Sequence, residues 1–129
     1  MATAGQAKFA VEFNNYRSAE VALGDRDELE VAPNTKLVRL GKKDIGVQLY
    51  DTFIVEYGAN NKIVLDLSYN STTTRGRINN AIPSGYRVHM VNKKIRLTRV
   101  HDGKFVECAD NGFAIFGINT TNGEVLASS

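Results

Sequence analysis

The feature that most constrains the fold is a two-residue period in hydrophobicity that recurs along most of the chain. In KIVLDL, for example, Ile63, Leu65 and Leu67 alternate with Val64 and Asp66. Such alternation is typical of antiparallel strands with one buried face and one solvent face. It predicts strands in KFAVEF (8–13) and near residues 36–40, 45–50, 53–57, 63–68, 86–91, 95–100 and 104–108.

Turn-forming segments separate these apolar runs. GKKD (41–44), GANNK (58–62), NKK (92–94) and HDGK (101–104) are rich in residues that tolerate the positive backbone angles of tight hairpins. FAIFGINTTNGEVLA (113–127) predicts one more hairpin, with NTTNG as its turn. Short strands at this regular spacing predict a mainly β fold, an antiparallel meander forming a small barrel or sandwich.

Two segments interrupt the alternation. Residues 14–32 are interpreted as a loop or one helical turn between Asn and Gly stops. Residues 73–82 are predicted to form one short helix, capped by Thr73 or Thr74 and ended by Pro83. A helix of about two turns is marginal alone, so packing on the sheet must hold it.

The length of 129 residues predicts a single β-rich domain over residues 1–129. Within it we expect an N-terminal strand and leader (1–33), a meander core (34–108) and a C-terminal hairpin (109–129). No apolar run approaches the ~18 residues of a membrane span, and the first residues do not have the pattern of a secretion signal. We therefore expect no contact with a membrane.

Catalytic and metal-binding motifs are not found. His89, His101 and Cys108 lack the spacing of metal ligands, and Cys108 falls in a strand pattern where a small buried side chain is the usual role. No serine lies in a nucleophile-elbow motif. We expect neither a catalytic residue, nor a metal, nor a cofactor, and predict that the protein is not an enzyme.

Charge is divided unevenly along the chain, although the net charge is only +2. Residues 75–104 hold eight basic side chains and one acidic one, whereas residues 10–30 hold six acidic and two basic ones. The sequence leaves two interpretations. Either the molecule has faces of opposite charge, or the two segments lie side by side and neutralise each other.

The predicted helix offers a first candidate site for an anion. A helix N-terminus presents unpaired N–H groups, and hydroxyl and guanidinium groups close to it would add donors. If Ile78, Ala81 and Ile82 face the core, Arg77 points away from it. The alternative is a threonine cap and arginines that pair with the protein's own acids. The candidate ligand-binding residues of this segment are Ser71, Thr72, Thr73, Thr74, Arg75 and Arg77.

A second cationic surface is predicted on the strands that follow the helix. Arg87 and His89 alternate outward on one strand, Arg96 shares that face on the next, and two lysines occupy the turn. Such a face suits a phosphate backbone. Aromatic partners are scarce, because Tyr86 has the parity of a core residue and there is no tryptophan. Any nucleic acid would therefore be bound without sequence specificity, and a merely solvated basic face is the alternative.

The order of these motifs resembles a widespread family of small bacteriophage-encoded proteins, most of which have no assigned function. The resemblance implies a viral origin. Two departures are SYNS, where relatives often have Gly-Gly-aromatic, and IRL, where they often have tryptophan. The matching segments are 34–40, 45–54, 62–67, 73–83 and 85–97.

Together these observations predict a phage-encoded, non-enzymatic binding protein that acts in host takeover or defence evasion in the host cytoplasm. Its ligand would be an anionic small molecule, such as a nucleotide or nucleotide signal, or a charged host protein. Arg87 or Arg96 would assist the helix residues. The alternative is a virion component, such as a decoration or tail accessory protein. A homo-oligomer is expected, because an unpaired edge strand often pairs with a second copy.

Overall fold

The computed structural model describes residues 8–128, which form ten strands and two helices. A seven-stranded antiparallel sheet has the order β1-β2-β3-β4-β5-β9-β10, and a separate sheet has the order β6-β7-β8. The helices are α1 (Tyr16–Leu23) and α2 (Thr72–Ala81). The strands are β1 (Glu28–Ala32), β2 (Thr35–Arg39), β3 (Asp44–Leu49), β4 (Thr52–Gly58), β5 (Lys62–Asp66), β6 (Tyr86–Val91), β7 (Lys94–Arg99), β8 (Phe105–Ala109), β9 (Ile115–Asn119) and β10 (Glu124–Ser128).

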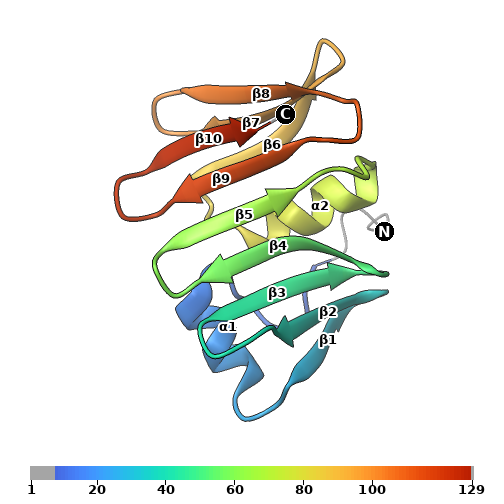
Figure 1. Cartoon of the computed structure of the whole chain (residues 1–129), viewed down its shortest axis with the longest axis vertical. Coiled ribbons are helices and arrows are strands. Elements are labelled where there is room, and N and C mark those ends of the chain that lie inside the picture. Colours follow the sequence, from blue (N-terminus) through green and yellow to red (C-terminus); the bar gives the residue numbers. More distant parts are fainter. Residues whose placement is uncertain (1–7, 129) are drawn as a thin grey trace.

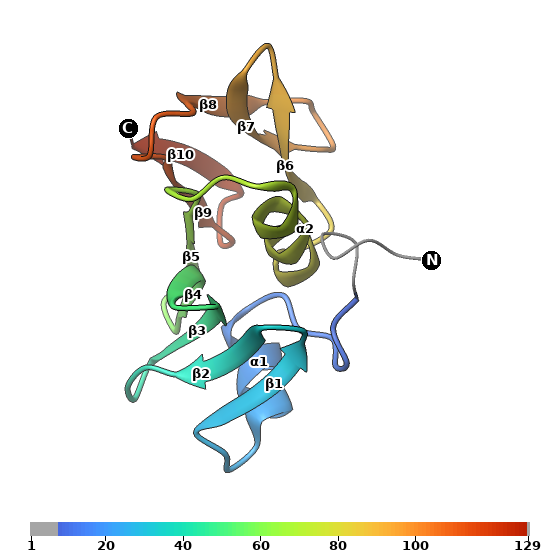
Figure 2. The same cartoon turned by 90° about the vertical axis from the view of Figure 1, so that its right-hand side faces the viewer.

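The predicted antiparallel meander is confirmed, but the sheet does not close into a barrel. β6, β7 and β8 pair only with one another, so β1 and β10 remain the two edges of the larger sheet. Both helices lie on one face of the seven-stranded sheet (Figures 1 and 2). α1 packs against β2 and β3, and α2 contacts β4 on one side and β6 on the other. Neither α1 nor α2 lies on the opposite face of this sheet.

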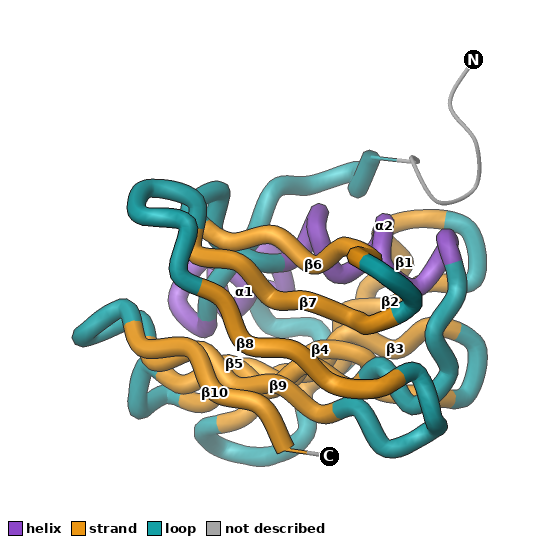
Figure 3. Tube along the Cα trace, turned by 90° about the horizontal axis from the view of Figure 1, so that it is seen from above, coloured by secondary structure: helices purple, strands orange, loops and turns teal. Residues whose placement is uncertain are grey.

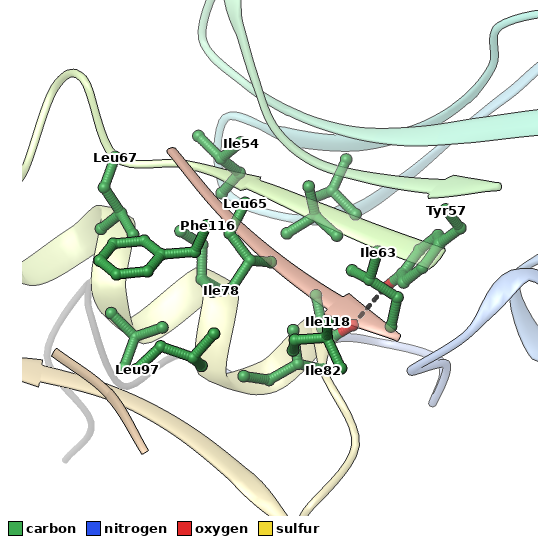
Figure 4. Packing of buried hydrophobic residues seen from close by; sticks show 14 of the residues in the cluster. Ile54, Tyr57, Ile63, Leu65, Leu67, Ile78, Ile82, Leu97, Phe116 and Ile118 are labelled. Atoms are coloured by element: carbon green, nitrogen blue, oxygen red, sulfur yellow. Dashed lines mark hydrogen bonds between the residues drawn. The ribbon is translucent and has the colours of Figure 1, made fainter. Parts of the chain in front are cut away.

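One core joins the two sheets through α2. Leu65 and Phe116 point from the larger sheet towards Ile78 of α2, and Leu97 of β7 approaches from the other side (Figure 4). All four side chains are at most 1% exposed. Burial of such side chains stabilises a fold by roughly 1.5–3 kcal/mol each. α2 is therefore an internal layer between the sheets, which explains how a two-turn helix of low propensity is held.

Polar side chains fix the small sheet to the rest of the molecule. Asn79 of α2 donates to the carbonyl of Val88 (2.9 Å) and accepts from the N–H of Val88 (2.8 Å), so it occupies the free edge of β6. Arg99 of β7 donates to the carbonyl of Gly123 (2.8 Å), in the turn between β9 and β10. A third bond joins the larger sheet to the end of α2. The Tyr57 hydroxyl of β4 donates to the carbonyl of Ala81, and burial raises the pKa of that phenol (Figure 4).

The helix and most strand predictions are confirmed, with boundaries that shift by a residue or two. The helix cap is different, because Ser71 and not Thr73 or Thr74 is the N-cap residue. The turn predictions hold as well. Asn92 and Lys93, between β6 and β7, both have positive φ, at 50° and 65°.

The N-terminal third of the chain was predicted least well. Residues 14–32 contain the two-turn helix α1 and the strand β1, where a loop or single turn was expected. Asn15 and Ser18 form a reciprocal capping box that begins α1, and this short polar signal does not stand out in an Asn-rich segment.

The strand predicted for KFAVEF is wrong within residues 8–13, and residues 1–7 of the predicted N-terminal segment lie outside the described chain. Phe9 and Phe13 do face the interior, with ring centroids 5.1 Å apart, and Phe13 packs edge-on against Tyr57. Alternation therefore identified burial correctly here, although the backbone does not join a sheet.

Candidate anion-binding site

The hydroxyl groups at the start of α2 are used within the helix itself. Ser71 Oγ accepts a hydrogen bond from the backbone N–H of Thr74 (3.0 Å), and the two hydroxyls lie 3.0 Å apart. Thr74 is only 1% exposed. Thr72 is exposed and Thr73 half-buried, so two of the four predicted hydroxyl residues lie at or near the surface without a capping role.

Arg77 is an interior residue, not the outward-facing one that the helical wheel predicted. Its side chain is 1% exposed, its Nε donates to Thr35 Oγ1 (2.8 Å), and its Nη2 donates to the carbonyl of Pro33 (3.3 Å). Burial lowers the pKa of this guanidinium. The wheel failed because the connection between β1 and β2 covers the side of α2 that was expected to be open to solvent.

Arg75 lies near the surface but is held by its neighbours. Its Nη1 donates to Asn70 Oδ1 (2.5 Å) and its Nη2 to Thr72 Oγ1 (3.4 Å). No carboxylate among residues 8–128 forms an ion pair with it. The predicted pairing with the protein's own acids is therefore not found for Arg75 in this range, since its observed partners are neutral side chains of its own segment.

The cleft beside the start of α2 is lined by acidic side chains and by no basic one among the described residues. It has a volume of about 540 Å³, and Thr73 lines it together with Asp51 and Asp66. The aromatic side chains of Tyr50 and Tyr69, both largely exposed, lie at the same cleft. Two carboxylates next to the ligand would oppose an anion, whereas buried Arg77 cannot reach it. Of the eight predicted site residues, those of α2 do not assemble into an open cationic pocket.

The outer side of β6, β7 and β8 forms a cationic surface, here called the basic face. Its residues lie in three cross-strand rows, and neither α1 nor α2 covers it (Figure 3). The predicted residues Arg87 and Arg96 both belong to this surface, as expected from strand parity. The rows are Arg87, Thr98 and Phe105; His89, Arg96 and Glu107; and Val91, Lys94 and Ala109.

Arg96 is the centre of the basic face. Its Nε and Nη2 donate to Glu107 Oε2, at 3.3 and 3.0 Å, and Lys94 Nζ lies 3.7 Å from Glu107 Oε1. The guanidinium carbon also lies 3.6 Å from the centroid of the Phe105 ring. This cation–π contact and the carboxylate hold the guanidinium plane in one orientation.

Phe105 is the residue of this face that the sequence analysis missed. It is 44% exposed, although most phenylalanines of the chain are more buried. The signal was available, because Cys108 was expected to be buried and Phe105 has the opposite parity in β8. Phe105 pairs with Thr98 of β7 and contacts Arg96, so its aromatic ring lies among the cations. The scarcity of aromatic partners expected from the sequence is thus wrong at this position.

His89 and Arg87 complete the face beside Arg96. His89 Nε2 lies 2.7 Å from Thr98 Oγ1. Burial lowers the pKa of the imidazole, and the charges of Arg87 and Arg96 lower it further, so the ring is neutral at pH 7. Arg87 is exposed and has no side-chain hydrogen bond or ion pair with any other residue in the described range 8–128. Its guanidinium is available to a ligand.

The acidic and basic segments lie at opposite ends of the molecule. Residues 86–109, which contain β6 to β8, hold six basic and two acidic side chains, whereas residues 16–32 hold two basic and five acidic ones. Figure 1 places β6, β7 and β8 at one end and α1 and β1 at the other. Of the two interpretations of the charge pattern, a molecule with oppositely charged ends agrees with the structure.

The other predictions about chemistry concern metal ligands, Cys108 and membranes. Residues 8–128 contain no group of three or more His, Cys, Asp or Glu side chains placed to share a metal ion. Cys108 is buried, as its strand pattern predicted, and its thiol donates to the carbonyl of Ser128 (3.5 Å). Neither of the two helices in the described range is long and apolar enough to cross a membrane.

Comparisons of the chain with protein-family models, curated proteins and solved structures give no match. Between the two predicted anion sites, the start of α2 combines internally bonded donors with carboxylates. The basic face combines the available guanidinium of Arg87, the oriented guanidinium of Arg96 and the exposed ring of Phe105.

Proposed function

We propose that the protein is a non-enzymatic binding protein whose ligand is a nucleotide or an unstructured single strand of nucleic acid, held on the basic face. The observation that carries the proposal is the stack of Arg96 on exposed Phe105, beside the available guanidinium of Arg87. Arginine planes and aromatic rings are the surfaces on which proteins stack unpaired bases. Nearby cations are what the phosphates require.

The arrangement fits binding without sequence specificity. Stacking accepts any base, because every base has a π-face. Glu107 already occupies the inner edge of the Arg96 guanidinium, so fewer donors remain for reading base edges. Arg87 on β6 and Lys94 on the adjacent strand β7 would follow a phosphate backbone across the sheet. Affinity should therefore depend strongly on salt and weakly on base identity.

The setting that we propose is the cytoplasm of a bacterial host, in takeover of the host or evasion of its defences. It rests on the resemblance to small phage-encoded proteins and not on the site. A virion component is the second candidate. The observation that favours it is the outer face of the seven-stranded sheet, which neither α1 nor α2 covers, because such a surface suits assembly with other subunits.

The direct test is fluorescence anisotropy with a labelled thymidine homopolymer, repeated with a purine strand and with a labelled mononucleotide. The double substitution Arg87→Ala, Phe105→Ala should weaken binding at least about tenfold, since stacking alone contributes roughly 1–3 kcal/mol per base. Both residues lie on the outside of the small sheet, so the variant should keep the melting temperature within a few degrees.

The matched control is Arg75→Ala, which removes a guanidinium from the start of α2 and leaves the basic face unchanged. Equal affinity of this control and the wild-type protein supports the basic face. If instead Arg75→Ala abolishes binding and the double variant does not, the ligand lies at α2. Absence of binding to every strand and nucleotide at low salt would refute the proposed function.

A further inference from the structure

The outer side of β5, β9 and β10 is a surface that the proposed function does not use. The middle row runs from Val64 through Gly117 to Leu126, and the two apolar side chains are 42% and 56% exposed. The next row runs from Lys62 through Asn119 to Glu124, and both charged side chains are exposed. The six residues of these two rows are here called the glycine face.

None of the residues that the structure describes accounts for a glycine at position 117. A Cβ at this position would come no closer than 3.9 Å to any described atom outside its chain neighbours, and its φ is not positive. Glycine within a strand costs about 0.5–1 kcal/mol relative to alanine. Such a glycine often marks a place where another backbone or a ligand approaches closely.

Gly46, on β3 of the same sheet, gives the contrast. A Cβ there would lie 2.7 Å from Phe53 Cδ1 and 2.8 Å from Leu40 Cδ1, so two side chains of the protein already cover this glycine. Close side-chain contacts among the described residues therefore explain glycine at position 46 but not at position 117. Among residues 8–128 no side chain fills the space above Gly117, so this space is open to a partner.

We infer that the glycine face is the interface of a two-fold symmetric dimer of this protein. A two-fold axis parallel to β9, above Gly117, sets the two Gly117 residues opposite each other across the interface. It also turns β5 of one copy onto β10 of the other. Val64 then packs against Leu126 of the second copy, and Lys62 meets Glu124 of the second copy.

Charge complementarity is the reason for choosing a second copy as the occupant. Lys62 of β5 and Glu124 of β10 are the two cross-strand partners of Asn119. The rotation that pairs the apolar residues therefore also pairs these opposite charges. Such self-complementarity is what an isologous interface requires. The packing of one sheet face on another, with nearly aligned strands, is the usual geometry of a β-sandwich.

The charges provide the sharpest test, by sedimentation velocity across a range of protein concentrations. Lys62→Glu should weaken the dimer at least about tenfold, because it sets carboxylates of the two copies against each other. Combining Lys62→Glu with Glu124→Lys should restore the wild-type dissociation constant. The control Lys43→Glu makes the same charge change in the turn before β3 and should leave the dimer intact.

A second variant addresses the glycine. Gly117→Lys should give a folded monomer, with the circular dichroism of the wild-type protein, since a Cβ fits at this position. A wild-type protein that is monomeric at all concentrations would overturn the inference, as would a Gly117→Lys variant that still dimerises. Failure of the charge swap to rescue Lys62→Glu would also overturn it. Pairing through the edge strand β1 predicts no response to any of these variants, and pairing through β10 predicts none to Lys62→Glu or Gly117→Lys.

Discussion

The two outer faces of the molecule differ in a way that their strand patterns do not suggest. Both are the solvent sides of antiparallel strands whose inner sides share one core. The basic face carries cations, a neutral imidazole and an aromatic ring that contact one another across three strands. The glycine face carries the apolar side chains of Val64 and Leu126 on either side of Gly117. It also carries a positive charge on β5, at Lys62, and a negative charge on β10, at Glu124.

This difference indicates where function resides in such a fold. The inner positions must match one another, because the sheets and α2 pack as a single core. The outer positions are free of that constraint, so their composition reflects what they meet. A hydrogen-bonded cationic face suits a small charged ligand, whereas an apolar face with a central glycine suits another protein surface.

The comparison would break down if α2 were itself a ligand site and not the layer that supports both faces. The substitution Arg77→Ala tests this, and it has the largest expected effect on the free energy of unfolding. It leaves Thr35 Oγ1 and the Pro33 carbonyl without the guanidinium and creates a void next to α2. We expect a loss of roughly 2–4 kcal/mol in the free energy of unfolding. Urea denaturation measures it.

Arg75→Ala is the control, because it removes an arginine from the same helix at its surface. It should cost less than about 0.5 kcal/mol. Similar losses for both variants would mean that α2 does not distinguish a buried side from an open one.

A smaller effect is expected from Asn79, which joins α2 to the small sheet. Asn79→Ala removes two hydrogen bonds to the Val88 backbone and exposes the edge of β6. The loss in unfolding free energy should be about 1–2 kcal/mol, with faster hydrogen exchange in β6 than in β3. Equal exchange rates in the two strands would show that the basic face does not depend on this contact.

The smallest effect concerns pH. Since burial and two arginines lower the pKa of His89 in the folded protein, the unfolded chain takes up that proton first as pH falls below about 6.5. Stability should decrease between pH 7 and pH 5, and less so in His89→Gln, whose amide can still bond Thr98. Melting temperatures at the two pH values test this. A wild-type protein that loses no more stability between pH 7 and pH 5 than His89→Gln would contradict the assignment.

The sequence was sufficient for the meander because alternation and turn residues are local signals. Ile63, Leu65 and Leu67 reveal their inner face without knowledge of their neighbours. α1 was missed because its capping box, Asn15 and Ser18, is a two-residue signal in an Asn-rich segment.

The candidate site was harder to predict, because it depends on which segment covers which. Arg77 could be recognised as buried only once the connection between β1 and β2 was known to lie over α2. Arg87 and Arg96 were assigned to one face correctly, because strand parity alone decides that point. Phe105 needed one more step, since its parity follows from buried Cys108 in the same strand.

The central claim is that the anionic ligand lies on the basic face. Titration of isotopically labelled protein with a short thymidine strand, followed by amide chemical shifts, tests it most directly. The account predicts that the largest shifts fall in β6, β7 and β8, around Arg87, Arg96 and Phe105. Largest shifts at residues 70–76, or a titration that moves no amide in β6 to β8, would contradict it.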